Sequence, residues 1–400
     1  MGYKTTLCDV SLDGGHYGIA APAVDFKPGL PAYLRITDIS DDGTLNPSDR
    51  KSVDDSSAGN YLLHEGDIVF ARTGNSTGRN YYYDPRDGEY AYAGFLIKFS
   101  LDPRKINPRY MKYYAQSKQY WDWVSSFNTG STRGNINAKT YASMPIDLPS
   151  RQIQDAIVAI CDAIDDKIRI NRQLNDYLEQ LCQSLFNRFD NDENNPFVKV
   201  SDIADVNPRR TLKKGEEALC IEMADLSTTG AFPTDWRTKA YNGGVKFVNG
   251  DTILARITPC LENGKAGYIN FLEQDEVAFG STEYIVLTSK GELPSEFFYF
   301  LARNEDFISY ATAHMNGSSG RQRVSGSDVG NYEVRMPSEK QISEFRKIAG
   351  NAMRVISASS IESRKLAQLR DALLPKLMSG EIDASKVELT QLTNNHLTDC

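Results

Sequence analysis

The 400-residue sequence lacks the features of several common protein classes. No run of about 18 apolar residues occurs, and the mean hydropathy is −0.46, so no membrane span is expected. The first residues lack the basic and then apolar pattern of a signal peptide. The six cysteines are scattered without a CxxC pair, and the four histidines lie far apart, so we expect neither a disulfide framework nor a histidine-rich metal site. These absences favour a cytoplasmic protein.

Motifs for catalysis are also missing. The sequence contains no GxxxxGK[ST] phosphate loop, no GxGxxG after a strand, and no GxSxG or HExxH motif. Its Asn-Pro pairs lack the Pro-Pro-aromatic continuation that amino-methyltransferases use. Cys161 and Cys182 fall in a predicted helix, where packing is the expected role of a cysteine. We therefore predict a non-catalytic binding protein with no catalytic residues, no metal and no cofactor of its own.

Charge is unevenly distributed along the chain. The 45 lysines and arginines against 53 aspartates and glutamates give a net charge of −8, which argues mildly against a nucleic-acid binder. The stretch 104–139 is nevertheless basic, and the stretch 38–67 is rich in acidic residues. A local basic surface is therefore compatible with the negative net charge of the whole chain.

An internal repeat is the main organising feature of the sequence. GDIVFAR at 66–72 returns as GDTILAR at 250–256, and NTGSTRGNI at 128–136 returns as NGSSGRQRV at 316–324. LPSRQIQ at 148–154 returns as MPSEKQI at 336–342. The offsets lie between 184 and 188 residues, which is the period of a duplicated domain and not of a solenoid.

Each copy begins with short strand-like runs and ends with one long helix. The runs DIVFAR, YAGFLIKFSL, VKFVNGDTILARI and TEYIVLT are bounded by Gly, Asn, Asp and Pro, as half-buried strands are. Aromatic-rich helical patches opened by proline follow at 108–124 and 294–311, and their helical spacing favours a core role over base stacking. The sequence thus predicts an α+β protein with two similar strand-rich domains.

The long helices carry an apolar heptad pattern in the same register in both copies. Polar residues interrupt both patterns near the middle, which costs stability and fixes register. One interpretation is that each helix covers the core of its own domain. We favour instead an antiparallel helix pair related by a pseudo-two-fold axis, with a break or kink in the second helix at Pro375. The predicted seam of this pair comprises Ile157, Ile160, Ile164, Lys167, Asn171, Leu174, Leu178, Leu181, Leu185, Phe345, Ile348, Val355, Leu366, Leu369 and Leu373.

This layout resembles the specificity subunit of Type I restriction-modification enzymes. The resemblance rests on the GDI(V/L)-A-R element, the Gly-Ser-rich loop before each Pro-Ser, the two heptad helices and the RDALLPKLMSGEI ending, and it covers about 5–385. It implies two target-recognition domains, at 1–150 and 191–337, separated by conserved long helices at 151–190 and 338–380, with a C-terminal tail at 381–400. It further implies double-stranded DNA as ligand, each domain reading one half of an asymmetric bipartite site.

The resemblance also implies protein partners. Two methyltransferase subunits would dock on the helices, and restriction and translocase subunits would join for cleavage. S-adenosylmethionine, ATP and Mg would then be bound by these partners.

Candidate DNA contacts follow from residue type and position. Arginine can bind guanine or phosphate, and small polar groups on glycine-punctuated loops suit close approach to DNA. A structural ion pair or a solvated turn is the alternative for each of them. The candidates are Arg72, Arg79, Asn128, Thr129, Ser131, Thr132, Arg133, Asn135, Arg256, Lys265, Asn316, Ser318, Ser319, Arg321, Gln322 and Arg323.

Two other functions stay open at this point. One is a coiled-coil scaffold whose duplicated domains bind proteins. The other is a specificity subunit of a related methyltransferase system that lacks a translocating nuclease.

Overall fold

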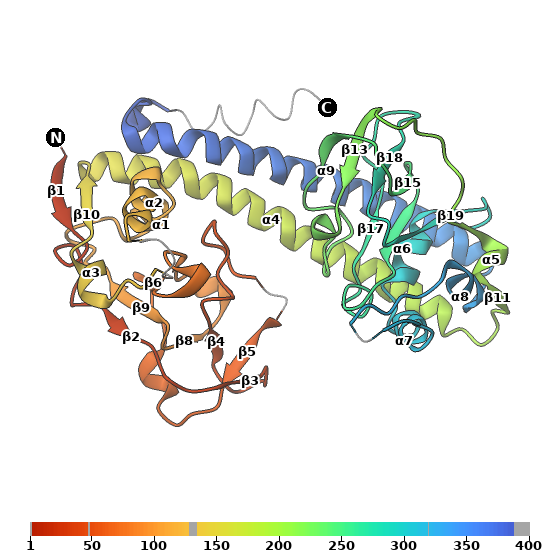
Figure 1. Ribbon diagram of the computed structural model, residues 1–400, viewed down its shortest axis with the longest axis horizontal. Coiled ribbons are helices and arrows are strands. Elements are labelled where there is room, and N and C mark those ends of the chain that lie inside the picture. Colours follow the sequence, from red (N-terminus) through yellow and green to blue (C-terminus); the bar gives the residue numbers. More distant parts are fainter. Residues whose placement is uncertain (1, 47–48, 128–133, 319, 388–400) are drawn as a thin grey trace. The chain divides into compact units, whose positions relative to one another are not determined.

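The computed structural model describes residues 2–46, 49–127, 134–318 and 320–387 (Figure 1). The chain divides into two compact units, of which unit 1 comprises 1–166 and 367–400 and unit 2 comprises 167–366. Each unit therefore combines one strand-rich part with a portion of both long helices. Within the described residues, no helix is both long enough and apolar enough to cross a membrane.

Unit 1 contains two four-stranded sheets and one two-stranded sheet. The first sheet has the order β2-β9-β6-β7, the second has the order β3-β5-β4-β8, and β1 pairs with β10. The bounds of these strands are β1 Tyr3–Thr6, β2 His16–Tyr17, β3 Ala23–Asp25, β4 Ala32–Leu34, β5 Lys51–Val53, β6 Asp67–Ala71, β7 Asn80–Tyr82, β8 Tyr90–Tyr92, β9 Leu96–Ser100 and β10 Pro145–Leu148.

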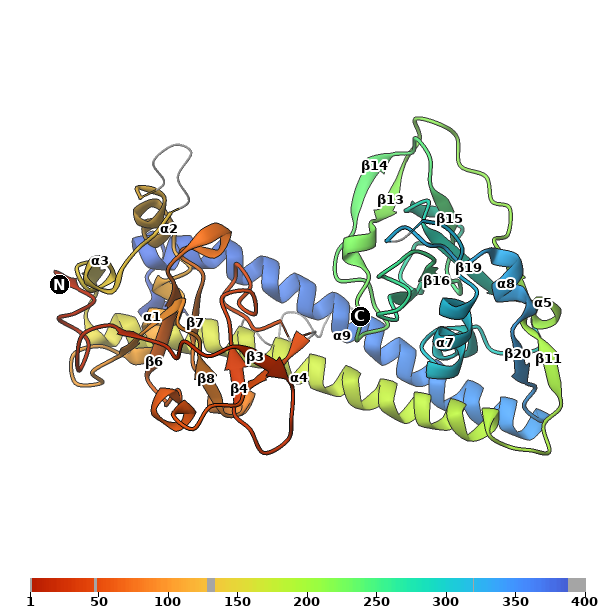
Figure 2. The same cartoon turned by 60° about the horizontal axis from the view of Figure 1, so that its bottom comes forward.

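Unit 2 repeats the same plan (Figure 2). Its sheets have the orders β12-β19-β16-β17 and β14-β13-β18-β15, and β11 pairs with β20. The parallel pairing of β4 with β8 in unit 1 recurs as the parallel pairing of β13 with β18. The bounds are β11 Phe197–Lys199, β12 Ala204–Val206, β13 Glu217–Ile221, β14 Arg237–Ala240, β15 Val245–Phe247, β16 Thr252–Ala255, β17 Ala266–Tyr268, β18 Ala278–Gly280, β19 Tyr284–Ser289 and β20 Glu333–Arg335.

The GDIVFAR and GDTILAR motifs form β6 and β16, which are buried on both faces. Alternate side chains of a strand point to opposite faces, so each strand joins two cores. Val69 packs with Leu34 and Tyr92 of the second sheet, whereas Phe70 stacks on Tyr141, with ring centroids 4.9 Å apart. The motif is apolar over several consecutive residues because its strand packs on other parts of the unit with both faces.

The aspartate of each motif has a structural role. Asp67 accepts hydrogen bonds from Ser100 and Lys98, and Asp251 accepts them from Thr288 and Arg210. Both carboxylates are buried and also accept a backbone amide three residues earlier, which closes the turn before the strand.

Short helices flank the sheets in both units. Each predicted aromatic patch is divided into two helices, because Ser117 and Asn304 cap a second helix and so interrupt the first. The tyrosines of the first patch are buried, which confirms the core interpretation, as does the burial of Cys161 and Cys182. The helices are α1 Pro108–Tyr114, α2 Lys118–Ser125, α3 Ala138–Ala142, α5 Val200–Ile203, α6 Glu296–Ala302, α7 Glu305–Ala313 and α8 Gly326–Asn331, with 3₁₀ turns at Ala58–Tyr61, Gly74–Ser76, Pro85–Asp87, Met223–Asp225 and Ala384–Lys386.

Two long helices complete the fold, α4 at Arg151–Asp190 and α9 at Glu339–Ser379. In unit 2, Asn171 of α4 contacts Ser359 of α9, and Arg188 contacts Glu344, so the two helices run antiparallel. In unit 1, α9 continues through Pro375, and the predicted break there is wrong. The predicted α+β class with long antiparallel helices is confirmed.

The buried surface of the helices is wider than the predicted seam. Leu174, Leu181 and Val355 were expected in the seam but are exposed, and Lys167 is exposed as well. In unit 2 the helices also pack on the strand-rich part, so residues one step away from the seam, such as Phe186, join that core instead. The other seam positions are buried or half-buried, namely Ile157, Ile160, Ile164, Asn171, Leu178, Leu185, Phe345, Ile348, Leu366, Leu369 and Leu373.

Both interpretations of the helices thus hold in part. The helices contact each other, and within unit 2 they also cover the core of the strand-rich part. The predicted domain limits stay a prediction, because the compact units cut across both helices.

Candidate nucleic-acid interface

Arg72 and Arg256 lie at equivalent points of the two units, directly after β6 and β16. The amide of Arg72 donates to the carbonyl of Phe95 over 3.0 Å, and the amide of Arg256 donates to that of Glu283 over 3.0 Å. Within the described part of the chain, the buried Nε of each arginine has no hydrogen-bond partner. A buried donor without a partner is costly, which marks both side chains as incompletely satisfied by the fold. Since both arginines are partly exposed, an external acceptor can reach the rest of the guanidinium group.

The segments after the Gly-Ser loops lie beside these arginines. The amide of Ile136 donates to the carbonyl of the first arginine over 2.9 Å, and the amide of Val324 donates to the second over 3.0 Å. The preceding residues, Asn135 and Arg323, form antiparallel bridges with the residues that follow the arginines. The structure therefore brings the predicted strand-end arginine close to the last residue of the predicted loop, which is Asn135 in unit 1 and Arg323 in unit 2.

Two exposed aromatic residues lie near the arginine of unit 1, one through its ring and one through its backbone. The guanidinium of Arg72 lies over the ring of Tyr17, 4.9 Å from its centroid. The Tyr17 hydroxyl accepts a hydrogen bond from the amide of Ala138, and the ring is partly exposed. Phe95 is also exposed, with 58% of its surface accessible. An arginine stacked on an exposed aromatic ring can bind phosphate while the ring contacts a base.

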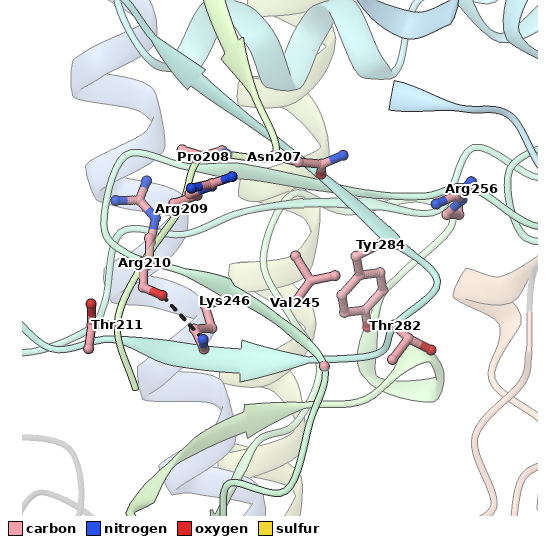
Figure 3. Close-up of a pocket in the computed structure, with 11 residues that line it drawn as sticks. Asn207, Pro208, Arg209, Arg210, Thr211, Val245, Lys246, Arg256, Thr282 and Tyr284 are labelled. Atoms are coloured by element: carbon pink, nitrogen blue, oxygen red, sulfur yellow. Dashed lines mark hydrogen bonds between the residues drawn. The ribbon is translucent and has the colours of Figure 1, made fainter. Parts of the chain in front are cut away.

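The arginine of unit 2 lines a pocket instead (Figure 3). The pocket has a volume of about 550 Å³, and its lining includes Arg209, Arg210, Lys246 and Arg256. Figure 3 shows Arg209 and Arg210 together on one side of the pocket and Arg256 on the other. Four cationic side chains around one hollow favour an anionic ligand.

One of these cations is neutralised within the fold. Arg210 donates to both carboxylate oxygens of the buried Asp251, over 2.6 and 2.7 Å. Burial raises the pKa of Asp251, although hydrogen bonds from Thr288 and Arg210 counteract the effect. Arg209 is exposed and forms no ion pair among the residues described, so its charge is available to a ligand.

Arg323 is held by a carboxylate. Its Nε and Nη2 donate to Glu283 over 2.6 to 3.0 Å, in a bidentate ion pair. Hydrogen bonding from Arg323 lowers the pKa of Glu283, so the carboxylate is ionised at neutral pH. The pair sits directly beside Arg256, whose amide bonds the Glu283 carbonyl.

The loops themselves are described in part. The loop of unit 2 is closed by Asn316 and Arg323, which exchange two backbone hydrogen bonds of 2.9 Å. Gly317 and Gly320 have φ of +132° and +76°, conformations that favour glycine in the turn. Ser318, Arg321 and Gln322 lie between these ends. The candidates Asn128, Thr129, Ser131, Thr132, Arg133 and Ser319 lie outside the described residues.

Arg79 and Lys265 are equivalent to each other and are engaged internally. The carbonyl of Arg79 accepts from the amide of Ala71, and the carbonyl of Lys265 accepts from that of Ala255. The side chain of Arg79 binds Asp41 and a backbone carbonyl, and Lys265 donates to a backbone carbonyl over 2.9 Å. Both side chains therefore tie a hairpin to a neighbouring turn, and a DNA contact would have to compete with these bonds.

The sequence did not single out several residues of this interface. Tyr17, Phe95 and Glu283 are far from the motifs in sequence and meet them only through strand pairing. The Asn-Pro-Arg-Arg run at 207–210 was considered only as a methyltransferase motif, although its two adjacent arginines were a visible basic signal.

Comparison with known proteins agrees with this arrangement. Residues 44–180 match the family model described as Type I restriction modification DNA specificity domain. The chain is similar to Type I specificity subunits. The resemblance seen in the sequence is thereby confirmed, and the matched segment includes Arg72, Asn135 and the first part of α4.

Relatives share the similarity at low sequence identity. The Type I restriction enzyme HindI specificity subunit of Haemophilus influenzae is 20% identical, over 80% of this chain and 87% of that protein. The EcoEI specificity subunit of Escherichia coli is 26% identical, over 48% of this chain and 33% of that protein. A crystal structure of a Type I restriction-modification S subunit from M. genitalium has the same fold, with a TM-score of 0.58 and 16% identity, over 94% of this chain and 96% of that one.

Proposed function

We propose that this chain is the non-catalytic DNA-recognition subunit of a Type I restriction-modification complex. In this proposal each strand-rich domain reads one half of an asymmetric bipartite site in double-stranded DNA. The observation that carries the proposal is the repeated arginine, Arg72 and Arg256, with the same backbone bonds and the same unpartnered Nε in both units.

The surroundings of the arginines support a DNA ligand. The last residue of a polar loop, Asn135 or Arg323, lies close to each of them, and unit 2 adds the basic pocket with Arg209 and Lys246. We propose that these cations bind phosphates and that the loop residues contact base edges, because phosphate contacts position a protein and base contacts select sequence. The base contacts proposed here are those of the candidate residues in the loops at 128–135 and 316–323.

We assign the helices a spacing and docking role. At 1.5 Å per residue, a helix of 40 residues is about 60 Å long, which exceeds one turn of B-DNA at roughly 34 Å. In the proposal the helices fix the gap between half-sites and bind two methyltransferase subunits. These and the restriction and translocase subunits would bind S-adenosylmethionine, ATP and Mg.

The test is selection from a random duplex pool by the chain in complex with its methyltransferase partners. Enrichment of two short motifs at a fixed spacing supports the proposal. Enrichment of no motif, together with stable protein complexes, would favour the coiled-coil scaffold instead. Mapping of modified adenines in cells with and without the chain gives an independent readout, and a system without a translocating nuclease would show modification but no cleavage.

A further inference from the structure

Asn135 and Arg323 occupy the same place in the two units but differ in chemistry. Each follows a Gly-Ser loop, bridges the residue after the repeated arginine and precedes the amide that bonds that arginine's carbonyl. Since the backbone register is the same, the two side chains leave their strands on the same face. The structure thus presents an amide in unit 1 where it presents a guanidinium in unit 2.

The hydrogen bonds of Arg323 leave a defined pair of donors. A guanidinium has five N–H groups. The carboxylate of Glu283 accepts hydrogen bonds from the Nε–H of Arg323 and from one N–H on Nη2. The carbonyl of Arg321 accepts one from an N–H on Nη1, over 3.1 Å. One N–H then remains on each terminal nitrogen, which is a bidentate pair of donors held in place by Glu283.

Asn135 has an unengaged side chain in a different setting. It is exposed, and its amide makes no hydrogen bond within the described residues. The position equivalent to Glu283 is Phe95 in unit 1, since both carbonyls accept the amide of the repeated arginine. Phe95 cannot hold a cation by an ion pair, and its exposed ring offers an apolar contact instead.

We propose that this position determines one base of each half-site. Arginine forms two hydrogen bonds with guanine O6 and N7, and asparagine forms two with adenine N6 and N7. Unit 2 therefore selects guanine through Arg323, and unit 1 selects adenine through Asn135, with Phe95 placed to contact a neighbouring thymine methyl group. This assignment rests on the proposed function and names the bases that the site prefers.

A reciprocal exchange tests the assignment. The complex carrying Asn135→Arg with Phe95→Glu rebuilds the glutamate–arginine pair in unit 1, and the complex carrying Arg323→Asn removes it from unit 2. Selection from a random duplex pool should show one position of one half-site changing from adenine to guanine in the first complex, on the order of tenfold or more. One position of the other half-site should change from guanine to adenine in the second complex.

Matched controls separate base reading from charge. Asn60→Arg adds at an exposed position of unit 1 the positive charge that Asn135→Arg alone introduces, and Lys199→Asn removes one positive charge from the exposed surface of unit 2, as Arg323→Asn does. Neither control should change any base preference. Glu283→Gln tests the positioning role of the carboxylate: the guanine preference should weaken while affinity for unrelated DNA stays unchanged.

Failure of the assignment can be distinguished from failure of the proposed function. If the unaltered complex selects a split site and both exchanges leave every position unchanged, the base assignment is wrong and DNA recognition stands. If the unaltered complex selects no site, the proposed function itself is wrong. Loss of all binding by the exchanged forms, with unchanged unfolding midpoints, would also overturn the assignment, because it predicts altered and not abolished preference.

Discussion

The side-chain amide of Asn171 in α4 donates to the carboxylate of Glu362 in α9 over 2.8 Å. The same amide lies 3.2 Å from the carbonyl of Ser359 and 3.1 Å from the hydroxyl of Ser363. Lys167 adds an ion pair with Glu362. This polar layer within unit 2 gives the helix pair one favourable register, because any sliding would bury these groups without partners.

Replacement of Asn171 by alanine should therefore destabilise the chain. The side chain is buried, with 3% of its surface accessible, and its loss leaves the Ser359 carbonyl with one bond fewer. We expect the free energy of unfolding to fall by about 1–2 kcal/mol, measured by urea denaturation. Arg172→Ala, on the exposed side of the same helix, is the control and should have little effect. Equal losses in both variants would contradict a special role for the polar layer.

Asp165 predicts a pH dependence of stability in unit 1. Burial alone would raise the pKa of this carboxyl, but Lys112 and Arg370, the latter 3.0 Å away, outweigh burial and lower the pKa. A lowered pKa in the folded state stabilises the fold above the ordinary value of 3.8, and this contribution is lost as the pH falls below it. Unfolding by urea should therefore require less denaturant below about pH 4.

Asp165→Asn isolates this contribution. At pH 7 the variant leaves two partly buried cations, Lys112 and Arg370, without this carboxylate, and we expect a loss of about 1–3 kcal/mol. The difference from the unaltered chain should shrink as the pH falls below about 4, where the unfolded state gains a proton, and it should be lost once the pH falls below the lowered pKa of Asp165. Asp155→Asn on the same helix is the control, because its carboxylate is half exposed. A pH-independent difference would show that Asp165 acts through packing alone.

Arginine and lysine substitutions should separate ligand-binding cations from structural ones. Arg72→Ala and Arg256→Ala remove guanidinium groups whose Nε has no hydrogen-bond partner among the described residues, and each should weaken DNA binding by about 1–3 kcal/mol in a titration with the selected duplex. Arg79→Ala and Lys265→Ala remove internal hydrogen bonds, and each should instead lower stability by about 1 kcal/mol. If Arg79→Ala and Lys265→Ala weakened DNA binding while Arg72→Ala and Arg256→Ala lowered only stability, the first pair would bind the ligand and the second would be structural.

Much of the fold could be predicted because its signals are local or repeated. The heptad pattern predicted the long helices, and the motif repeat predicted two similar domains, since duplication preserves sequence order. The exposure of Leu174 and Val355 could not be predicted, because it depends on which helix face meets the strand-rich core. The split of the aromatic patches was readable in principle from the capping residues Ser117 and Asn304.

The candidate interface was predictable only in part. Arg72, Arg256 and the loops were found through the repeat, since equivalent residues stand at equivalent offsets. Tyr17 and Glu283 were missed because strand pairing and a tertiary ion pair bring them to the arginines. Such neighbours have no sequence signature, because their spacing from the motif depends on the loops between the strands.

The basic pocket of unit 2 leads to a prediction about salt. If Arg209 contacts a phosphate, each such contact releases counterions, and the logarithm of affinity falls with the logarithm of salt with a slope of about −0.9 per contact. Arg209→Ala should therefore make the slope shallower by about 0.9 and weaken binding of all sequences alike, measured between roughly 50 and 200 mM salt. Lys199→Ala, which removes an exposed cation on β11 of the same unit, is the matched control and should leave the slope unchanged. A change in base preference without a change in slope would mean that Arg209 reads bases, and the pocket would then belong to the specificity-determining surface.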